Sequence, residues 1–114
     1  RGVCDYLGIN LAEINNQKEI PNAYALKQNY PNPFNPITTI DIQLKEPGGN
    51  IKLSILDISG NEVRALVNQY LPTGVKSFQW DSKDENGQAV SSGVYFYHLE
   101  TNFFKSSRKM ILIK

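Results

Sequence analysis

Asn29-Tyr30-Pro31-Asn32-Pro33-Phe34-Asn35-Pro36 is the stretch that decides what the rest of this chain can form. Its prolines, at positions 31, 33 and 36, fix φ and remove backbone donors, so neither a helix nor a central strand can pass through it. Directly afterwards Ile40, Ile42 and Leu44 fall at period 2, as a half-buried strand requires. We call residues 29–36 the clasp, and we expect this rigid segment to open a β domain.

Short strand-like runs follow one another on both sides of the clasp, with turn signals between them. The expected strands are Ala25–Gln28, Thr38–Leu44, Ile51–Ile58, Val63–Gln69, Val75–Asp81, Val94–Glu100 and Ser106–Ile113. Residues 63–69 also fit a helical period, but the tight turn Ser59-Gly60-Asn61 just before them favours a strand. Seven short strands without a long helical segment predict an all-β fold, an antiparallel β-sandwich of immunoglobulin-like type. Trp80 is the expected anchor of its core.

The first 23 residues differ from the rest of the chain. A wholly polar run, Asn15–Glu19, is followed by the chain-breaking pair Pro21-Asn22. We expect residues 1–23 to be the tail of a preceding domain and a linker, and residues 24–114 to form the immunoglobulin-like domain. An extra edge strand is the alternative for the first segment. The chain starts at Arg1 without a methionine, which indicates a piece of a longer polypeptide.

Composition excludes several classes of function. The chain has 114 residues, of which 40% are hydrophobic and 20% charged, and these are ordinary values for a globular protein. A net charge of +1 argues against a dedicated nucleic-acid binder. No run of 18 apolar residues is present, so no transmembrane segment is expected. The single cysteine, Cys4, cannot form an internal disulfide; it pairs outside this segment or is buried as a small hydrophobe.

The last expected strand is basic. After Glu100 there is no acidic residue, and the basic residues are Lys105, Arg108, Lys109 and Lys114. These charges fit an edge strand whose exposed positions discourage aggregation, and they also fit a recognition tag read by another protein. We expect this edge to be left available for docking. Val94, Phe96, Met110 and Leu112 leave the edge strands apolar on both faces, so either other elements cover the second face or a partner docks on it.

The loop Asp81-Ser82-Lys83-Asp84-Glu85-Asn86-Gly87 is the candidate metal site. Asp81, Asp84 and Asn86 could supply some of the six to eight oxygens that calcium takes. Lys83 occupies a position where a calcium loop would have a ligand, and no glutamate follows at the required distance. Turn formation is the favoured alternative, because Asn86-Gly87 is a strong turn dipeptide and aspartates cap backbone donors. We therefore expect no cofactor.

No catalytic arrangement can be assembled from the sequence. His98 is the only histidine and lacks a cysteine or a second histidine as partner, which favours a packing or solvent-facing role. Serines are present, but a nucleophile needs a base and an orienting group. An aromatic sugar-binding face is one interpretation of Tyr95, Phe96, Tyr97, Phe103 and Phe104; alternating core and cover residues are the favoured one. We expect no enzymatic activity.

Several motifs occur in one order along residues 24–114. They are the clasp, Asp57–Val63, Leu71–Gly74, Trp80-Asp81, Asn86-Gly87, Ser92–Tyr97 and Arg108–Lys114. This ordered set resembles the type A C-terminal sorting domain of type IX secretion substrates. It is also similar to the immunoglobulin-like domain of the flagellar hook-capping family.

The resemblance to sorting domains implies a role without catalysis. Such domains direct an upstream cargo domain of the same polypeptide from the periplasm across the outer membrane, to the medium or the cell surface. The implied partners are the outer-membrane secretion translocon and a sortase-like peptidase, which commonly cleaves the linker, here between residues 15 and 25. The expected recognition residues are Pro31, Asn32, Pro33, Phe34, Gly93, Arg108, Lys109 and Lys114.

Two other classes of function remain open from the sequence. The domain could be a structural immunoglobulin-like spacer or assembly module of a multidomain enzyme or filament. It could also be a carbohydrate-binding accessory module, in which case Tyr95, Tyr97 and Phe104 would contact the sugar.

Overall fold

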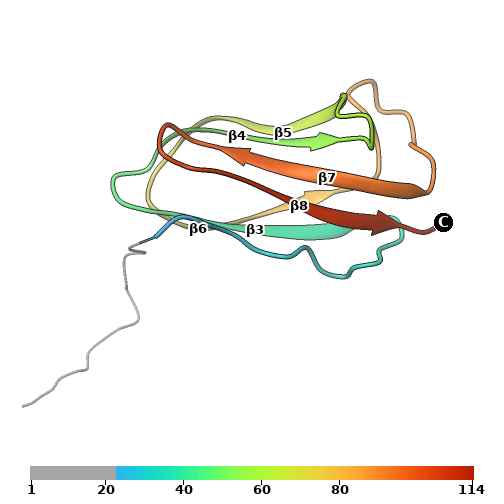
Figure 1. Cartoon of the computed structure of the whole chain (residues 1–114), viewed down its shortest axis with the longest axis horizontal. Coiled ribbons are helices and arrows are strands. Elements are labelled where there is room, and N and C mark those ends of the chain that lie inside the picture. The colour runs from blue at the N-terminus through green and yellow to red at the C-terminus, as the bar shows by residue number, and fades with distance from the viewer. Residues whose placement is uncertain (1–22) are drawn as a thin grey trace, which may run out of the picture.

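The computed structural model describes residues 23–114, which form seven strands and no helix that could cross a membrane (Figure 1). The strands are β2 (Ala25–Leu26), β3 (Thr38–Leu44), β4 (Gly49–Leu56), β5 (Glu62–Leu71), β6 (Gly74–Trp80), β7 (Gly93–Glu100) and β8 (Lys105–Leu112). Every expected strand is present, with ends that differ by two residues at most. The all-β prediction is confirmed, and residues 62–71 are a strand rather than a helix.

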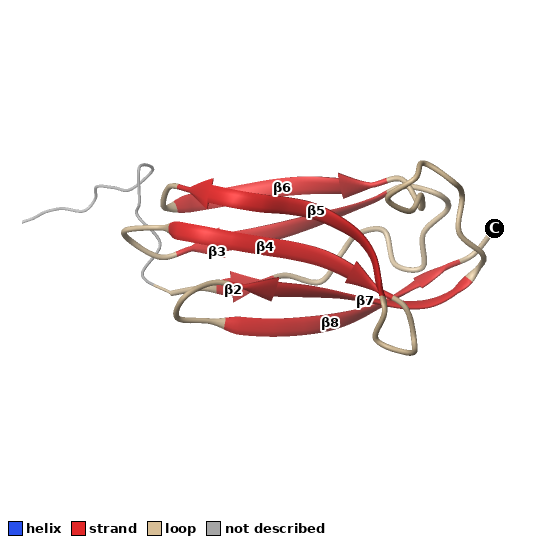
Figure 2. Cartoon of the chain, turned by 90° about the horizontal axis from the view of Figure 1, so that it is seen from above, coloured by secondary structure: helices blue, strands red, loops and turns tan. Residues whose placement is uncertain are grey.

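The strands form two antiparallel sheets that pack as a sandwich. One sheet has the order β2-β3-β6 and the other has the order β5-β4-β7-β8. Figure 2 shows the strands running lengthwise, with the connecting loops gathered at the two ends. This arrangement is the predicted immunoglobulin-like sandwich. The predicted linker, its cleavage region and Cys4 lie outside the described residues, apart from residues 23–25.

The core lies between the sheets and is built from alternate residues of each strand. Trp80 is fully buried, as expected, and its ring packs 5.8 Å from that of Phe34 and 5.4 Å from that of Tyr95. Its indole Nε1 donates to the carbonyl oxygen of Lys83 at 2.9 Å. A buried aromatic residue of this size contributes about 3 kcal/mol or more to the stability of the fold.

Two local features shape the sandwich beyond simple alternation. The β4–β5 register shifts between Leu53 and Ser54 and again between Ile55 and Leu56, so β5 carries extra residues and bends over the core. Gly48 has a φ of +87°, and a Cβ there would lie 2.4 Å from the carbonyl oxygen of Leu71. Only glycine permits this close approach of the β3–β4 turn to the end of β5.

Candidate recognition site

The clasp pairs with the last strand of the domain. The backbone N–H of Phe34 donates to the carbonyl of Ile111 at 3.0 Å, and that of Ile113 donates to the carbonyl of Phe34 at 3.0 Å. The side chain of Asn32 accepts a hydrogen bond of 3.0 Å from the N–H of Ile111. Phe34 and Leu112 thus form a parallel bridge. Prolines lie on both sides of Phe34, so the clasp contributes a single pairing residue to β8 instead of a full strand.

The chain before the clasp follows the same edge of β8. The ring of Tyr24 stacks on that of Phe104, with centroids 5.5 Å apart. Further along, Arg108 Nε donates to the carbonyl of Leu26 at 2.6 Å, and Gln28 Nε2 donates to the carbonyl of Lys109 at 3.0 Å. Residues 24–34 therefore run alongside residues 104–113 in the same direction. We call this line of contacts the seam.

The seam overturns the expectation that the edge of β8 is left available. In the strand order β8 is the outermost strand of its sheet. However, the outward-pointing backbone groups at Lys109, Ile111 and Ile113 are bonded to residues of the seam. The physical reason is that unpaired edge groups recruit a neighbouring chain, and here the segment that enters the other sheet supplies the partners. A docking strand would have to displace residues 28–34.

A buried polar network fastens the entry to the clasp onto β7. The hydroxyl of Tyr97 donates to the carbonyl of Lys27 at 2.7 Å and accepts a hydrogen bond of 2.8 Å from the N–H of Asn29. Tyr97 is fully buried, and Asn29 is only 3% exposed. Burial raises the pKa of the Tyr97 phenol, and the hydrogen bond from Asn29 and the charge of Arg108 oppose that rise.

Asn29 organises the first turn of the clasp. Its Nδ2 donates to the carbonyl of Pro31 at 3.1 Å and to Oγ1 of Thr38 at 2.8 Å. The Thr38 hydroxyl in turn donates to the carbonyl of Pro31 at 3.0 Å, and Gln28 Nε2 donates to Asn29 Oδ1 at 2.7 Å. Sequence reasoning placed Asn29 in the clasp and Tyr97 among candidate sugar contacts, and it missed the hydrogen bond that joins them. The available signal was a hydroxyl on a core-facing position of a strand, because a buried tyrosine requires a hydrogen-bond partner.

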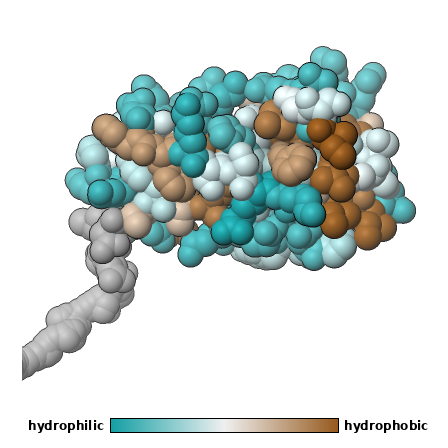
Figure 3. Space-filling view, viewed as in Figure 1, coloured by the Kyte–Doolittle hydropathy of each residue, from teal (hydrophilic) through white to brown (hydrophobic). Residues whose placement is uncertain are grey.

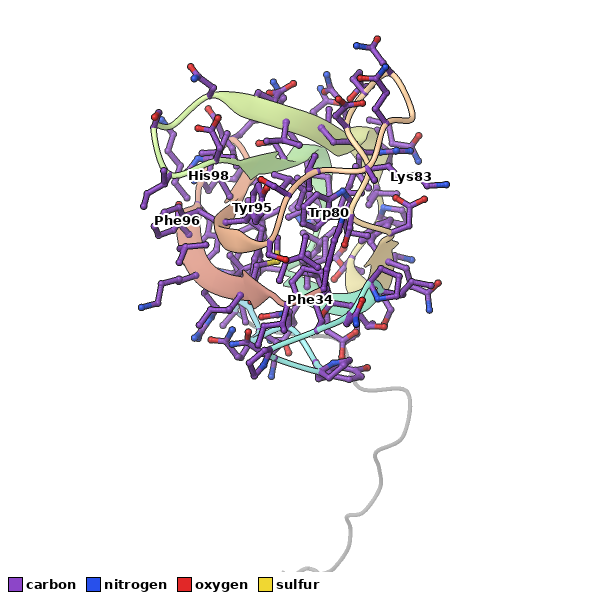
Figure 4. All side chains as sticks on the ribbon, turned by 90° about the vertical axis from the view of Figure 1, so that its right-hand side faces the viewer. Phe34, Trp80, Lys83, Tyr95, Phe96 and His98 are labelled. Carbon is purple, nitrogen blue, oxygen red and sulfur yellow. The ribbon has the colours of Figure 1, made fainter. Side chains whose placement is uncertain are left out.

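The far end of the clasp is fixed to the loop after β6 and to the core. The hydroxyl of Ser82 donates to the carbonyl of Pro36, and the side chain of Phe34 is 2% exposed. Figure 4 looks at this end of the molecule, where Phe34, Trp80 and Tyr95 lie together in the interior. Phe34 therefore acts as a core residue.

The expected recognition residues separate into two groups. Pro31, Asn32, Pro33, Lys109 and Lys114 lie exposed at the surface. Phe34 is buried, and Gly93 is half-buried with a φ of +154°, where side chains are strained. Arg108 is also exposed, and its Nε donates to the carbonyl of Leu26.

The start of β7 is tied to the last residue of the chain. The N–H of Lys114 donates to the hydroxyl of Ser92 at 3.0 Å, beside Gly93. The seam brings the clasp to the same strand end, so three segments far apart in the sequence meet there.

The candidate calcium loop has the geometry of a turn. One oxygen of Asp84, Oδ1, accepts hydrogen bonds from the N–H groups of Asn86 at 2.9 Å and Gln88 at 3.0 Å. The neighbouring Glu85 bonds through its own N–H to the carbonyl of Val63 and through its carboxylate to the N–H of Ala65. Within residues 23–114, no three His, Cys, Asp or Glu side chains gather into a metal-sized cluster. The carboxylate of Asp84 thus shapes the turn, and that of Glu85 bonds to the start of β5.

The remaining candidate side chains do not form a common site. His98 lies on the outer face of β7, with its Nδ1 2.6 Å from the Ser107 hydroxyl. Tyr95 and Tyr97 face the core, whereas Phe96 faces outward between them. Phe103 is 75% exposed at the opposite end of the strand. The aromatic sugar-binding face is therefore not assembled, because strand alternation divides its members between two faces.

Two solved structures from Porphyromonas gingivalis resemble this chain. Dimeric latent PorU superposes with a TM-score of 0.61 and 24% identity, over 80% of this chain and 9% of PorU. PorZ, a surface component of the type-IX secretion system, superposes with a TM-score of 0.50 and 22% identity, over 80% of this chain and 11% of PorZ. FlgD from P. aeruginosa superposes with a TM-score of 0.51 and 22% identity, over 66% of this chain and 58% of that one. These likenesses establish the shared fold.

Sequence comparison places the chain more narrowly. The basal-body rod modification proteins FlgD of Salmonella typhimurium and Salmonella typhi are each 34% identical to it over 58 residues, which is 51% of this chain. The match spans 25% of the length of those relatives. The model of the FlgD Ig-like domain family matches residues 35–102, which is more than half of the chain. The chain thus belongs to the FlgD Ig-like domain family.

Proposed function

We propose that this chain is a sorting domain of type A for type IX secretion. In this function it catalyses no reaction. It directs an upstream cargo domain across the outer membrane by protein–protein contact with the secretion translocon, and a sortase-like peptidase releases the cargo to the medium or the cell surface. Residues 23–114 would then be the folded targeting signal of an exported protein.

One observation carries the proposal. The clasp, Gly93 and the end of β8 come from three separate parts of the sequence, and they meet at one end of the sandwich. These segments are three of the seven motifs on which the resemblance to sorting domains rests. A composite surface of this kind exists only in the folded domain, so a receptor that reads it would discriminate folded cargo-bearing chains from unfolded ones.

The comparisons support the proposal at the level of the fold. PorZ belongs to the type-IX secretion system, and it contains a region of the same fold as residues 23–114. The proposal goes further than this likeness, because it assigns to this chain a role in the same system.

The test is export of a fluorescent reporter that carries a periplasmic leader and the complete 114-residue chain at its C-terminus. In a host with a type IX system, we expect this fusion to reach the medium or the surface, and the reporter alone to stay in the periplasm. Deleting the last ten residues is an unsuitable variant, because it removes the buried side chains Met110 and Leu112. Retention of the complete fusion in the periplasm of that host would refute the proposal.

A structural spacer or assembly module is the second candidate. The family membership and the match to flagellar FlgD favour it. It predicts that removing the domain from its parent protein changes the stability or assembly of the parent and leaves export unchanged. Measuring export and thermal stability of the same deletion separates the two candidates.

A further inference from the structure

We propose that the outer face of the β5-β4-β7-β8 sheet docks a protein partner that presents apolar side chains bordered by carboxylates. This inference deepens the proposed function and rests on it. The docking surface, called the apolar face, is formed by Leu56, Ile58, Val94, Phe96, Ile111 and Ile113.

The strand register makes these residues neighbours. Phe96 stands between Leu56 of β4 and Lys109 of β8, and Val94 stands opposite Ile111. Because side chains alternate along a strand, Leu56, Val94, Phe96 and Ile111 point away from the core that Tyr95 and Tyr97 enter. Ile58 and Ile113 lie just beyond the ends of β4 and β8. In Figure 4, Phe96 lies at the rim of the molecule, away from Trp80.

The described residues leave this face open to solvent. Ile58 is 75% exposed and Ile113 is 52% exposed, and the other members of the apolar face are half-buried. Figure 3 shows hydrophobic side chains gathered at the end of the molecule where the C-terminus lies. A contiguous apolar surface of this kind marks an interaction site, whereas a single exposed isoleucine would need no explanation.

A groove extends the apolar face at its end. Its volume is about 420 Å³, and it lies between residues 57–59 and residues 91–95. Ile58 and Val94 form its apolar walls. Asp57 Oδ1 accepts hydrogen bonds of 2.9 Å from the N–H groups of Ser59 and Asn61, which fixes this carboxylate in the turn at one side of the groove. The groove can therefore accept an apolar anchor side chain of a partner.

The charges around the face identify the chemistry of the occupant. Lys109 lies directly beside Phe96, and Lys114 lies beside the start of β7. Neither forms an ion pair with a residue of the range 23–114, where the pairs are Lys52–Glu62 and Lys105–Glu100. A partner with carboxylates around an apolar centre complements this arrangement and is steered toward it.

The seam explains why the partner uses the face of the sheet. The outward backbone groups of β8 near Ile111 are bonded to the clasp, so strand addition at that edge is blocked. The apolar face needs no rearrangement to be contacted.

The experiment measures export of the reporter fusion with the complete chain. Phe96→Ser and Ile58→Ser should each lower the exported fraction about tenfold or more, since aromatic and well-packed anchors dominate interfaces. Val75→Thr is the matched control, because Val75 is 60% exposed on the other sheet, and its export should be unchanged. Lys109→Glu should lower export, and Lys109→Arg should preserve it. Thermal unfolding of each purified variant verifies that it is folded; Ile58 is exposed enough that its substitution leaves the fold intact.

The outcomes are separable. If the unmodified fusion is exported and the face variants are exported equally, the apolar face is not the docking surface and the proposed function stands. If the unmodified fusion stays in the periplasm, both fail. Two measurements test other occupants of the apolar face. Sedimentation of the purified chain tests for a second copy, and flotation with phosphatidylethanolamine–phosphatidylglycerol vesicles tests for a lipid surface. Self-association or vesicle binding that Phe96→Ser abolishes would assign the face to a second copy or to a lipid surface and overturn the proposal.

Discussion

At the residue scale, the hydroxyl of Tyr97 is the most consequential polar atom in the sandwich. It joins the carbonyl of Lys27, just before the clasp, to the N–H of Asn29, the first residue of the clasp. A buried polar group without a partner costs more than a hydrogen bond contributes, so this one oxygen controls how the clasp is seated.

We expect Tyr97→Phe to destabilise the protein by about 1–3 kcal/mol, because it leaves a buried donor and acceptor without a partner. Chemical denaturation monitored by circular dichroism measures the free energy of unfolding. Tyr70→Phe is the control, because Tyr70 is 60% exposed, and its stability should change little. Equal stabilities of the Tyr97 and Tyr70 variants would contradict the role given to the network.

The same phenol predicts an alkaline dependence of stability. Burial raises the pKa of Tyr97, so the folded state holds this proton more tightly than the unfolded state does. The stability contribution is complete below the unfolded pKa of about 10 and is lost as the pH rises from there through the folded value. Between pH 9 and pH 12, the free energy of unfolding should fall more steeply with pH for the native chain than for Tyr97→Phe. Parallel curves would show that Tyr97 titrates alike in both states.

At the element scale, the strands were predictable and the seam was not. Alternation of Ile51, Leu53 and Ile55 reveals which face of β4 is buried, since period 2 is a local property of the sequence. The seam instead joins Asn32 to Ile111, which are 79 positions apart. Nothing local in an asparagine between two prolines indicates which distant N–H group will donate a hydrogen bond to it.

The candidate site shows the same division. The residues that carry it were found because prolines and a terminal basic run are visible in the sequence. The burial and contacts of these residues were not predictable from the sequence: Phe34 is a core residue, and Arg108 binds a backbone carbonyl. Both outcomes depend on how the two sheets are superposed, which the pattern of a single strand does not contain.

Asn32→Ala should loosen the edge of β8 without unfolding the domain. The N–H of Ile111 loses its acceptor, so its hydrogen exchange should become at least about tenfold faster, and that of Ile113 should follow to a smaller extent. Asn68→Ala, at an exposed position of β5, is the control and should leave both amides unchanged. Unaltered exchange at Ile111 in the Asn32 variant would mean that the clasp holds the edge without this side chain.

At the scale of the whole molecule, other segments of the chain bond to part of each edge of the four-stranded sheet. Residues of the seam cover β8, and Asp84 and Glu85 cover the start of β5. Edge groups that are already bonded are less available for pairing with strands of other chains. The outer surface of the sheet lies between these two edges, on a fold that other members of its family share.

The parallel course of residues 24–34 and 104–113 has a mechanical consequence. If residue 23 is pulled one way and residue 114 the other, the load runs along the two segments and strains the bonds at Leu26, Gln28, Asn32 and Phe34 together. Bonds loaded in shear share the force, whereas bonds opened like a zipper break singly. The domain is thus built to resist traction between its ends more strongly than traction applied across its sheets.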